Sequence, residues 1–308
     1  MILTDQSQLS ADEMAEVAAV IAASTAADHG SPVSEATLLR VRFPDRYQQV
    51  RHVVAREAGL VVGYGVLIPT EGPRPMVGEV AVHPRERGHG VGHEVVGRLL
   101  SLAGNAGLAL WAHGRHAPAA ALARSMGFDR QRCLLHMRRS LTTGLSDAPL
   151  PAGYRVRTFR PGVDDAAFLV ANAAAFKDLP DQGGWDEADL TARLAEPWFD
   201  PAGFFLVEAT SQPRPSDPQP RPLAGFHWTK LHPPQPLGEI YVLAVTPPHQ
   251  GRGLAAPLAL LGLRHLQDMG ANTAMLYVDE ANITAVRLYQ QLGFSVWDVD
   301  VLYARDPA

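Results

Sequence analysis

The sequence predicts a two-domain α/β protein in which one order of helices and strands occurs twice. The chain has 308 residues, more than one ordinary core requires and enough for two. Apolar residues make up 46% of it, as in globular proteins. The stretch VHPRERGHGVGHEV at 82–95 returns in outline as VTPPHQGRGLAAPL at 245–258. A repeat at this interval indicates two copies of one structural unit.

The first half reads as one helix, three strands, and then helix, strand, helix and strand. The capped amphipathic stretch SADEMAEVAAVIAAST predicts the first helix, alternating apolar residues predict the strands, and glycine ends the second helix. In order, these elements are expected at 10–25, 51–57, 60–69, 76–84, 90–107, 108–113, 117–128 and 133–141.

After a stretch with the composition of a linker, the second half returns to the same order, with two helices instead of one at its start. We expect domains at 1–140 and 153–308, joined by a linker at 141–152. The elements of the second half are expected at 164–176, 186–196, 203–209, 223–231, 237–245, 254–270, 273–278, 282–294 and 299–304. The proline-rich stretch at 211–222 predicts an exposed loop between two strands.

Composition and charge exclude several functional classes. The formal net charge of −5 argues against electrostatic binding of nucleic acid. The amino terminus lacks the basic and apolar regions of a leader peptide, and no apolar run is long enough to cross a membrane. We expect a cytoplasmic monomer without nucleic-acid or membrane partners. The single cysteine, Cys133, permits no internal disulfide and is expected to pack in the core.

Both repeats place glycines between a strand that ends in Val-x-Pro and the start of a helix. The second repeat has Gln250, Gly253 and Ala255 where the first has Arg87, Gly90 and Gly92. Free backbone N–H groups and the helix dipole favour anions at such a turn, and small residues let a pyrophosphate approach. The dinucleotide-binding fingerprint is a poor match, because neither turn contains the full G-x-G-x-x-G.

The pattern [Gln/Arg]-x-x-Gly-x-[Gly/Ala] resembles the acyl-coenzyme A loop of the GNAT superfamily of N-acetyltransferases. The stretches NITAVRLYQQLGF and APAAALARSMGF are similar to the helix and the ending that precede the last strand of that family. The resemblance implies two tandem GNAT-like domains, each with a mixed, mostly antiparallel sheet flanked by helices. It also implies acetyl-CoA as cosubstrate and no metal. The residues that it implies for binding acetyl-CoA are Val80, Ala81, Val82, Arg87, Gly88, His89, Gly90, Val91, Gly92, Leu243, Ala244, Val245, Gln250, Gly251, Arg252, Gly253, Leu254, Ala255, Asn282 and Arg287.

The stretches PVSEATLLR, DQGGWDEADL, GFHWTKLHP and GEIYVLAVTP resemble tandem-domain members of this superfamily over nearly the whole chain. That resemblance implies acetyl transfer to a small molecule, the cysteinyl derivative of glucosaminyl-inositol. The residues that it implies for binding this acceptor are Glu35, Asp181, Lys230, Glu239 and Tyr277. Asp181 stands where we expect a glutamate, so its side chain is shorter by one methylene group.

The reaction requires a base and an acid. An α-amine has a pKa of about 8, so it must lose a proton before it attacks a thioester. Glu239 lies on a strand just before the second turn and, by the two-residue period, is expected to share a face with Tyr241 and Leu243. Tyr289, seven residues after Asn282 on one helix, is the candidate donor of a proton to the departing thiolate.

The first domain is expected to be catalytically inactive. Counting from the strand ends places Met76 opposite Glu239, and counting from the helix ends places Ala123 opposite Tyr289. Neither residue is a base or an acid, although Glu79 lies nearby and could substitute, as could His113.

Two other functions remain open. One is acetyl transfer to another small-molecule or peptide amine on the same tandem scaffold. The other is a non-catalytic sensor of acyl-CoA, which would keep the turn but need neither Glu239 nor Tyr289.

Overall fold

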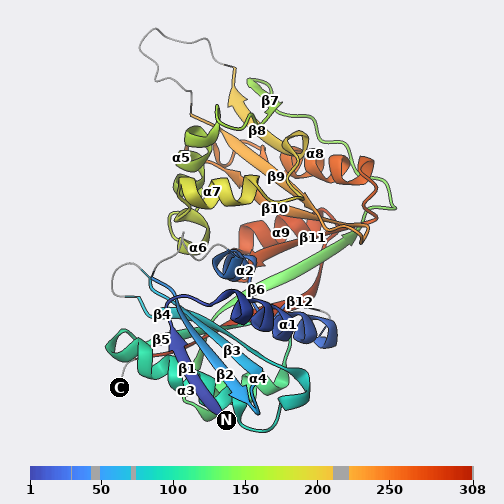
Figure 1. Cartoon of the computed structure of the whole chain (residues 1–308). Coiled ribbons are helices and arrows are strands. Elements are labelled where there is room, and N and C mark those ends of the chain that lie inside the picture. Colours follow the sequence, from blue (N-terminus) through green and yellow to red (C-terminus); the bar gives the residue numbers. More distant parts are fainter. Residues whose placement is uncertain (29, 43–48, 71–73, 211–221, 307–308) are drawn as a thin grey trace. The chain divides into compact units, whose positions relative to one another are not determined.

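The computed structural model describes residues 1–28, 30–42, 49–70, 74–210 and 222–306, and the chain forms two compact units (Figure 1). Unit 1 comprises Met1–Leu135, Asp279–Ala281 and Asp298–Ala308. Unit 2 comprises His136–Val278 and Asn282–Trp297. Unit 1 thus includes the last segment of the chain. The domain bounds expected from the sequence, 1–140 and 153–308, remain predictions. The loop expected at 211–222 lies outside the described residues up to position 221.

Unit 1 is built on a mixed sheet with the strand order β1-β2-β3-β4-β5-β12. Neighbouring strands in this order run antiparallel, except that β4 and β5 are parallel. The strands are β1 (Ile2–Gln6), β2 (Arg51–Glu57), β3 (Leu60–Ile68), β4 (Met76–Val82), β5 (Leu108–Ala112) and β12 (Ser295–Arg305). The helices are α1 (Ala11–Asp28), α2 (Glu35–Arg42), α3 (Val91–Ala103) and α4 (Ala117–Ser125).

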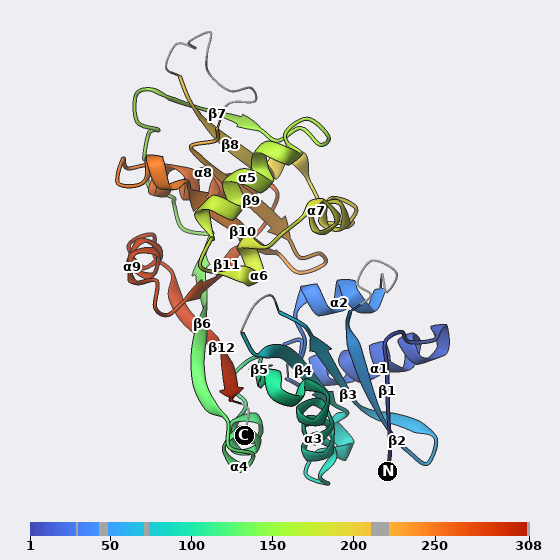
Figure 2. The ribbon, with the colours of Figure 1, turned by 90° about the vertical axis from the view of Figure 1, so that its left-hand side faces the viewer.

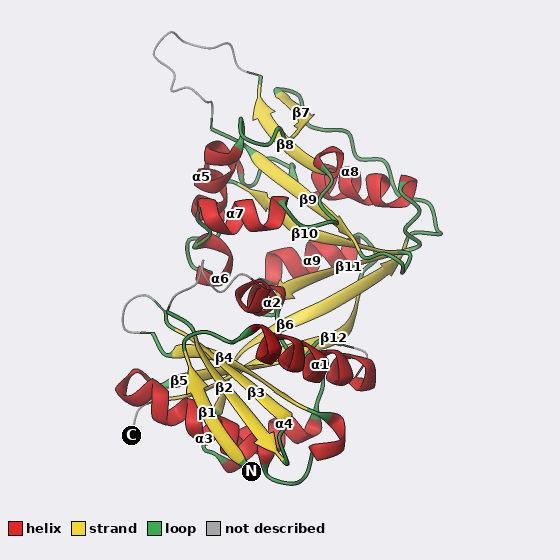
Figure 3. Cartoon of the chain, in the orientation of Figure 1, coloured by secondary structure: helices red, strands yellow, loops and turns green. Residues whose placement is uncertain are grey.

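Helices cover both faces of the unit 1 sheet (Figure 3). On one face, Val17 and Ile21 of α1 pack against Tyr64. On the other face, Val95 and Leu99 of α3 form a second cluster with apolar strand residues. Because successive strand residues point to opposite faces, one sheet supplies both cores.

Unit 2 repeats this architecture. Its strand order is β6-β11-β10-β9-β8-β7, with β10 and β11 parallel and the pairs from β10 to β7 antiparallel. The strands are β6 (Asp129–Ser140), β7 (Tyr154–Thr158), β8 (Phe204–Ala209), β9 (Gly225–Leu231), β10 (Leu237–Val245) and β11 (Thr273–Asp279). The helices are α5 (Asp165–Ala175), α6 (Pro180–Gly183), α7 (Glu187–Leu194), α8 (Ala255–Asp268) and α9 (Ile283–Gln291).

In unit 2, too, one apolar cluster lies on each face of the sheet. Phe168 of α5 and Leu190 of α7 pack with Trp228 on one face, and Leu258 of α8 packs with Val207 on the other. In Figure 2, α8 lies to the left of these strands and α7 to their right. The predicted fold class, a mixed and mostly antiparallel sheet flanked by helices in each half, is confirmed.

Strands β6 and β12 are each the last strand of one half of the sequence. Each extends into the unit formed mainly by the other half. Strand β12 lies beside β6 and belongs to unit 2 up to Trp297, and from Asp298 on it belongs to unit 1, where it pairs with β5 from Val301 opposite Ala112 to Arg305 opposite Leu108. Strand β6 begins in unit 1 but, from His136 on, belongs to unit 2, beside β11. Cys133 on β6 is a buried free thiol, as predicted. Each unit therefore contains a strand segment from the opposite half of the sequence.

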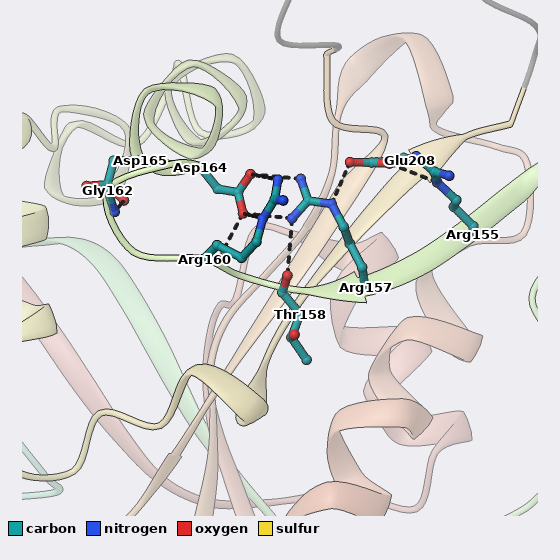
Figure 4. Close-up of polar contacts among 8 residues, drawn as sticks. All are labelled: Arg155, Arg157, Thr158, Arg160, Gly162, Asp164, Asp165 and Glu208. Atoms are coloured by element: carbon teal, nitrogen blue, oxygen red, sulfur yellow. Dashed lines mark hydrogen bonds and ion pairs between the residues drawn. The ribbon is translucent and has the colours of Figure 1, made fainter.

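Strand β7, which the sequence did not predict, lies at the edge of the unit 2 sheet, and its arginines belong to an ion network (Figure 4). Arg157 donates to both carboxylate oxygens of Asp164, at 2.7 and 2.8 Å, and to Glu208 at 2.7 Å. Burial acts to raise the pKa of Asp164, but hydrogen bonds from Arg157 and Arg160 lower it to about 2. Charged residues suit an edge strand and break the apolar alternation that predicts strands.

Helices of the described ranges are too short or too polar to span a membrane.

Candidate active site

The candidate site in unit 2 is organised by a bulge in β10. Glu239 pairs with Lys230 of β9, and Ile240 pairs with Thr229, but the next pair is Val242 with Trp228. Tyr241 is therefore an extra residue, which bends the strand and changes the direction of the side chains after it.

Because of the bulge, side chains of β10 do not alternate as the two-residue period predicts. A Cβ atom on Gly238 would meet Leu266 of α8, so Glu239 points to the opposite face. Tyr241 packs on that face, against the cluster around Trp228. Leu243 packs with the cluster on the α8 face instead. Glu239 and Tyr241 thus share a face, as predicted, and Leu243 does not.

Glu239 is a buried carboxylate with a histidine beside it. The residue is 6% exposed, and its Oε2 lies 2.6 Å from Nε2 of His232 in the β9–β10 turn. Lys230, directly opposite on β9, places its Nζ 4.4 Å from the ring centre of Trp198. An imidazole in contact with a carboxylate can accept a proton from it and release that proton to solvent. Sequence reasoning missed His232, although hairpin pairing from Lys230 would have placed it close to Glu239.

Arg193 of α7 holds the bulged residue in place. Its Nε donates to the hydroxyl of Tyr241 at 3.0 Å, and its guanidinium lies 3.9 Å from the ring centre of Trp185. Its Nη1 donates to the main-chain oxygen of Asp189 at 2.9 Å. The hydroxyl of Tyr241 is therefore fixed by a buried cation, and its ring lies 5.1 Å from Nζ of Lys230. No sequence motif signalled this contact.

The second predicted catalytic residue, Tyr289, lies on α9. The side chain of Asn282 caps this helix by accepting a hydrogen bond from the N–H of Ala285 at 3.1 Å. Tyr289 is buried, packs edge-on to Phe294, and has its pKa raised by that burial. The hydroxyl therefore keeps its proton at neutral pH and can act as a donor. Arg287, between the two, is exposed.

A gap in the sheet opens next to Glu239. The parallel ladder between β10 and β11 runs from Leu237 to Glu239 and ends there, among the described residues. Leu243 to Val245 pair with β9 on one side only. Among the described residues no strand pairs with their other side, so a ligand can bind there like an added strand, beside the Val245 oxygen that Gln250 contacts.

The glycine turn of unit 2 follows this gap. Gln250 donates from its side chain to the main-chain oxygen of Val245 at 3.1 Å, which closes the turn. Gly251 and Gly253 have φ of +72° and +76°, values that other residues rarely adopt. The first N–H groups of a helix have no partner within it, and helix α8, which begins at Ala255, has no side-chain cap to bind them. This arrangement suits a phosphate group.

Unit 1 contains the same gap and turn. The β4–β5 ladder ends at Glu79, before Val80 to Val82, and Arg87 donates from Nε to the main-chain oxygen of Val82 at 3.3 Å. Gly90 has φ of +88° and precedes α3. The guanidinium of Arg87 also makes two hydrogen bonds to Asp28, at 2.7 and 2.6 Å, so its charge is already paired.

The remaining predicted site residues lie on different elements. Glu35 is the first residue of α2 in unit 1 and is partly buried. Asp181 lies in α6, and its side chain is outside the described part of the chain. Tyr277 of β11 is 45% exposed and makes an edge contact with His136, with ring centres 4.2 Å apart. The structure brings together Glu239 and Lys230, and places Tyr277 two residues beyond Met275, the partner of Glu239.

Unit 1 lacks both catalytic groups at the matching positions. Strand β4 has no bulge against β3, so the residue that faces like Glu239 is Val77 rather than the predicted Met76, which packs towards α3. Neither carries a carboxylate. Ala123 of α4, opposite Tyr289, packs in the same cluster.

Glu79 and His113, the two residues of unit 1 that could substitute for the missing catalytic groups, contact each other. Nε2 of His113 lies 3.1 Å from Glu79, and its Nδ1 lies 2.9 Å from Asp300 of β12. The backbone N–H groups of Ser34 and Gly114 donate to the two carboxylates at 2.9 and 2.8 Å. The group therefore joins four segments of unit 1, and we call it the His113 triad.

Contacts within the His113 triad stabilise the charged forms of its imidazole and of Glu79. Burial acts to lower the pKa of His113, but hydrogen bonds with Asp300 and Glu79 raise it to about 10. Burial acts to raise the pKa of Glu79, but the contact with His113 holds it below its usual value. At neutral pH the imidazole is protonated and the carboxylate is ionised, so neither is set to deprotonate an amine.

Comparisons with known proteins agree with this geometry. The model of the acetyltransferase (GNAT) family matches residues 21–128 and 172–294, one match in each half. The chain is 45% identical over 294 residues to a mycothiol acetyltransferase of Thermobispora bispora, covering 94% of this chain and 95% of that protein. The chain belongs to the mycothiol acetyltransferases of the GNAT family. A mycothiol acetyltransferase of Streptomyces coelicolor is 43% identical over 297 residues, covering 96% and 93%.

Solved structures show the tandem GNAT fold. A tandem GNAT protein from the clavulanic acid biosynthesis pathway superposes with a TM-score of 0.73 at 20% identity, covering 99% of this chain and 98% of that one. A GCN5-related N-acetyltransferase from Sphaerobacter thermophilus gives 0.68 at 22% identity, covering 98% and 95%. The predicted family, tandem fold and acetyltransferase class are thus confirmed.

The His113 triad is expected to stabilise the fold in a way that depends on pH. Because the folded pKa of His113 is raised to about 10, its contribution is complete below the unfolded pKa of about 6.5 and disappears as pH rises through 10. We expect His113→Gln to lower the free energy of unfolding by about 3 kcal/mol at pH 7. The difference from wild type should shrink between pH 7 and 10.

Urea midpoints at pH 7, 8.5 and 10 test this. His93→Gln, at an exposed position of α3, is the control and should follow wild type at every pH. Equal midpoints for His113→Gln and wild type at pH 7 would show that the triad does not stabilise the fold.

Proposed function

We propose that this chain transfers acetyl from acetyl-CoA to the cysteinyl amine of glucosaminyl-inositol, the last step in making mycothiol. The observation that carries the proposal is the position of Glu239: a buried carboxylate where the parallel ladder ends, on the strand that leads into the glycine turn. The similarity of the chain to mycothiol acetyltransferases supports the choice of acceptor.

Binding of acetyl-CoA is assigned to the gap and the turn. Main-chain groups of Leu243 to Val245 would pair with the pantetheine arm, and N–H groups of Gly251 to Ala255 would hold the pyrophosphate. Asn282 and Arg287, at the start and middle of α9, would contribute from the other side.

Glu239 acts as the base in the proposed mechanism. It removes a proton from the acceptor ammonium, directly or through a water molecule, and His232 can pass that proton on. The free amine attacks the thioester carbonyl, the C–N bond forms, and the nitrogen loses its second proton to Glu239, which has passed the first to His232. When the C–S bond breaks, Tyr289 donates its proton to the coenzyme A thiolate and takes a new one from water. Lys230 and Tyr277, with Glu35 and Asp181, are proposed to bind the hydroxyls of the acceptor.

The two copies divide the work in this proposal. Unit 1 keeps the gap and the turn, so it binds acetyl-CoA or a related nucleotide without catalysing transfer. Its Glu79 and His113 serve structure instead, as members of the His113 triad.

Incubation with acetyl-CoA and three classes of amine tests the proposed function. The cysteinyl derivative of glucosaminyl-inositol should gain one acetyl group by mass, faster than aminoglycosides or peptides. Faster transfer to either of those would establish the alternative acceptor class. Binding of acetyl-CoA without transfer to any amine would indicate a sensor.

We expect Glu239→Gln to lower kcat at saturating acceptor by roughly 100-fold, because a positioned base contributes about that much. The loss should be largest at low pH, where more of the amine is protonated and less of it reacts unaided. Rates from pH 6 to 9 measure this, with exposed Glu187→Gln as the control. A mutant-to-wild-type ratio that does not change with pH would contradict the role of a base.

We expect Tyr289→Phe to bind acetyl-CoA as wild type does and to lower kcat by at least roughly tenfold. The ring still packs against Phe294, but the proton is gone. Calorimetry and steady-state rates measure the two effects, with Tyr303→Phe on β12 as the control. If single-turnover rates match wild type, Tyr289 is not the acid.

A further inference from the structure

Two exposed aromatic side chains lie on the face of the unit 2 sheet that carries Glu239. Trp297 of β12 is 63% exposed and Tyr277 of β11 is 45% exposed. Exposed tryptophan is uncommon, because burying its ring normally stabilises the fold. The chemistry assigned to Glu239 and Tyr289 does not use Trp297.

Strand pairing places Tyr277 on the same face as Glu239. Met275 is the partner of Glu239 in the parallel ladder, and paired residues of neighbouring strands point to the same side. Tyr277 is two residues further along β11, so it points to that side as well. Lys230, paired with Glu239 across β9, extends the row in the other direction.

Side-chain contacts carry the row on to Trp297. The ring of Tyr277 meets that of His136 on β6, with centres 4.2 Å apart. Arg138 is two residues after His136, on the same face of β6, and its guanidinium lies 4.5 Å from the ring centre of Trp297. The alternate β6 residues, Leu135 and Met137, are buried on the opposite side.

The row therefore begins at Glu239, the proposed base, and ends at Trp297, whose ring lies against the guanidinium of Arg138. Glu239 lies on β10, and Trp297 is reached through β11 and β6, so three strand spacings put it about 14 Å away across the sheet. The cysteinyl amine is at one end of the acceptor, and the two rings follow it. An acceptor with its amine at Glu239 reaches the aromatic end only with its rings.

We infer that Trp297 and Arg138 form a subsite for the sugar rings of the acceptor; this inference rests on the proposed function. The C–H face of a sugar ring packs on an aromatic surface, and guanidinium N–H groups donate to its hydroxyls. The occupant is a small polyhydroxylated ring rather than a protein, because two aromatic side chains cover far less area than a protein interface needs.

The kinetic test compares the complete acceptor with cysteine amide, which has the amine but no rings. Trp297→Ala should raise KM for the complete acceptor roughly tenfold, the scale of one lost aromatic contact, and leave kcat within about twofold. KM for cysteine amide should not change. Trp297→Phe should recover much of the loss, and Val296→Ala, the exposed neighbour on β12, is the matched control.

Three results would overturn the subsite: an unchanged KM, an equal rise of KM for both acceptors, or a loss confined to kcat. A binding measurement keeps the inference separate from the proposed function. Glucosaminyl-inositol without the cysteine cannot be acetylated at that amine, and its titration by calorimetry needs no turnover. Weaker binding of this glycoside by Trp297→Ala supports the subsite even if the enzyme uses another amine, and equal binding refutes it.

Discussion

In each unit, the parallel ladder between two strands ends three to six residues before the first of those strands ends. The candidate active site depends on the gap that this leaves in the sheet. The β10–β11 ladder stops at Glu239, whereas β10 continues to Val245. Backbone groups beyond the stop pair on one side with the antiparallel neighbour, and no strand of the described ranges pairs with the other side. Polar groups of this kind require a partner. The glycine turn and the start of α8 follow directly, so a strand-like arm and a phosphate can be bound together.

The two copies differ in what occupies the face beside the gap. In unit 2 the bulge at Tyr241 turns Glu239 and Tyr241 to one side, and Arg193 fixes the bulged ring. In unit 1 the strand has no bulge, and Glu79 is bound to His113. One copy therefore keeps a carboxylate next to an imidazole that is part-exposed, whereas the other buries its carboxylate in a charge network.

Patterns local in sequence predicted much of this structure, and contacts between distant strands did not. Glycine spacing predicted both turns because positive φ values are demanded at Gly90 and Gly253. The bulge at Tyr241 could not be predicted, since it depends on register against β9. The pairing of β12 with β5 is equally invisible to periodicity, which assigns a strand but not its partner. His232 belongs to no motif, and its place beside Glu239 follows from the pairing of β9 with β10.

The central claim is that both copies keep a binding gap while only unit 2 catalyses. Blocking each turn separately with a bulky side chain, by Gly90→Trp and Gly253→Trp in the full-length protein, tests it most directly. Turnover is measured beside circular dichroism, which confirms that both variants are folded. The account predicts that Gly253→Trp abolishes acetyl transfer and that Gly90→Trp retains most of it. Loss of transfer as complete in Gly90→Trp as in Gly253→Trp would contradict the account.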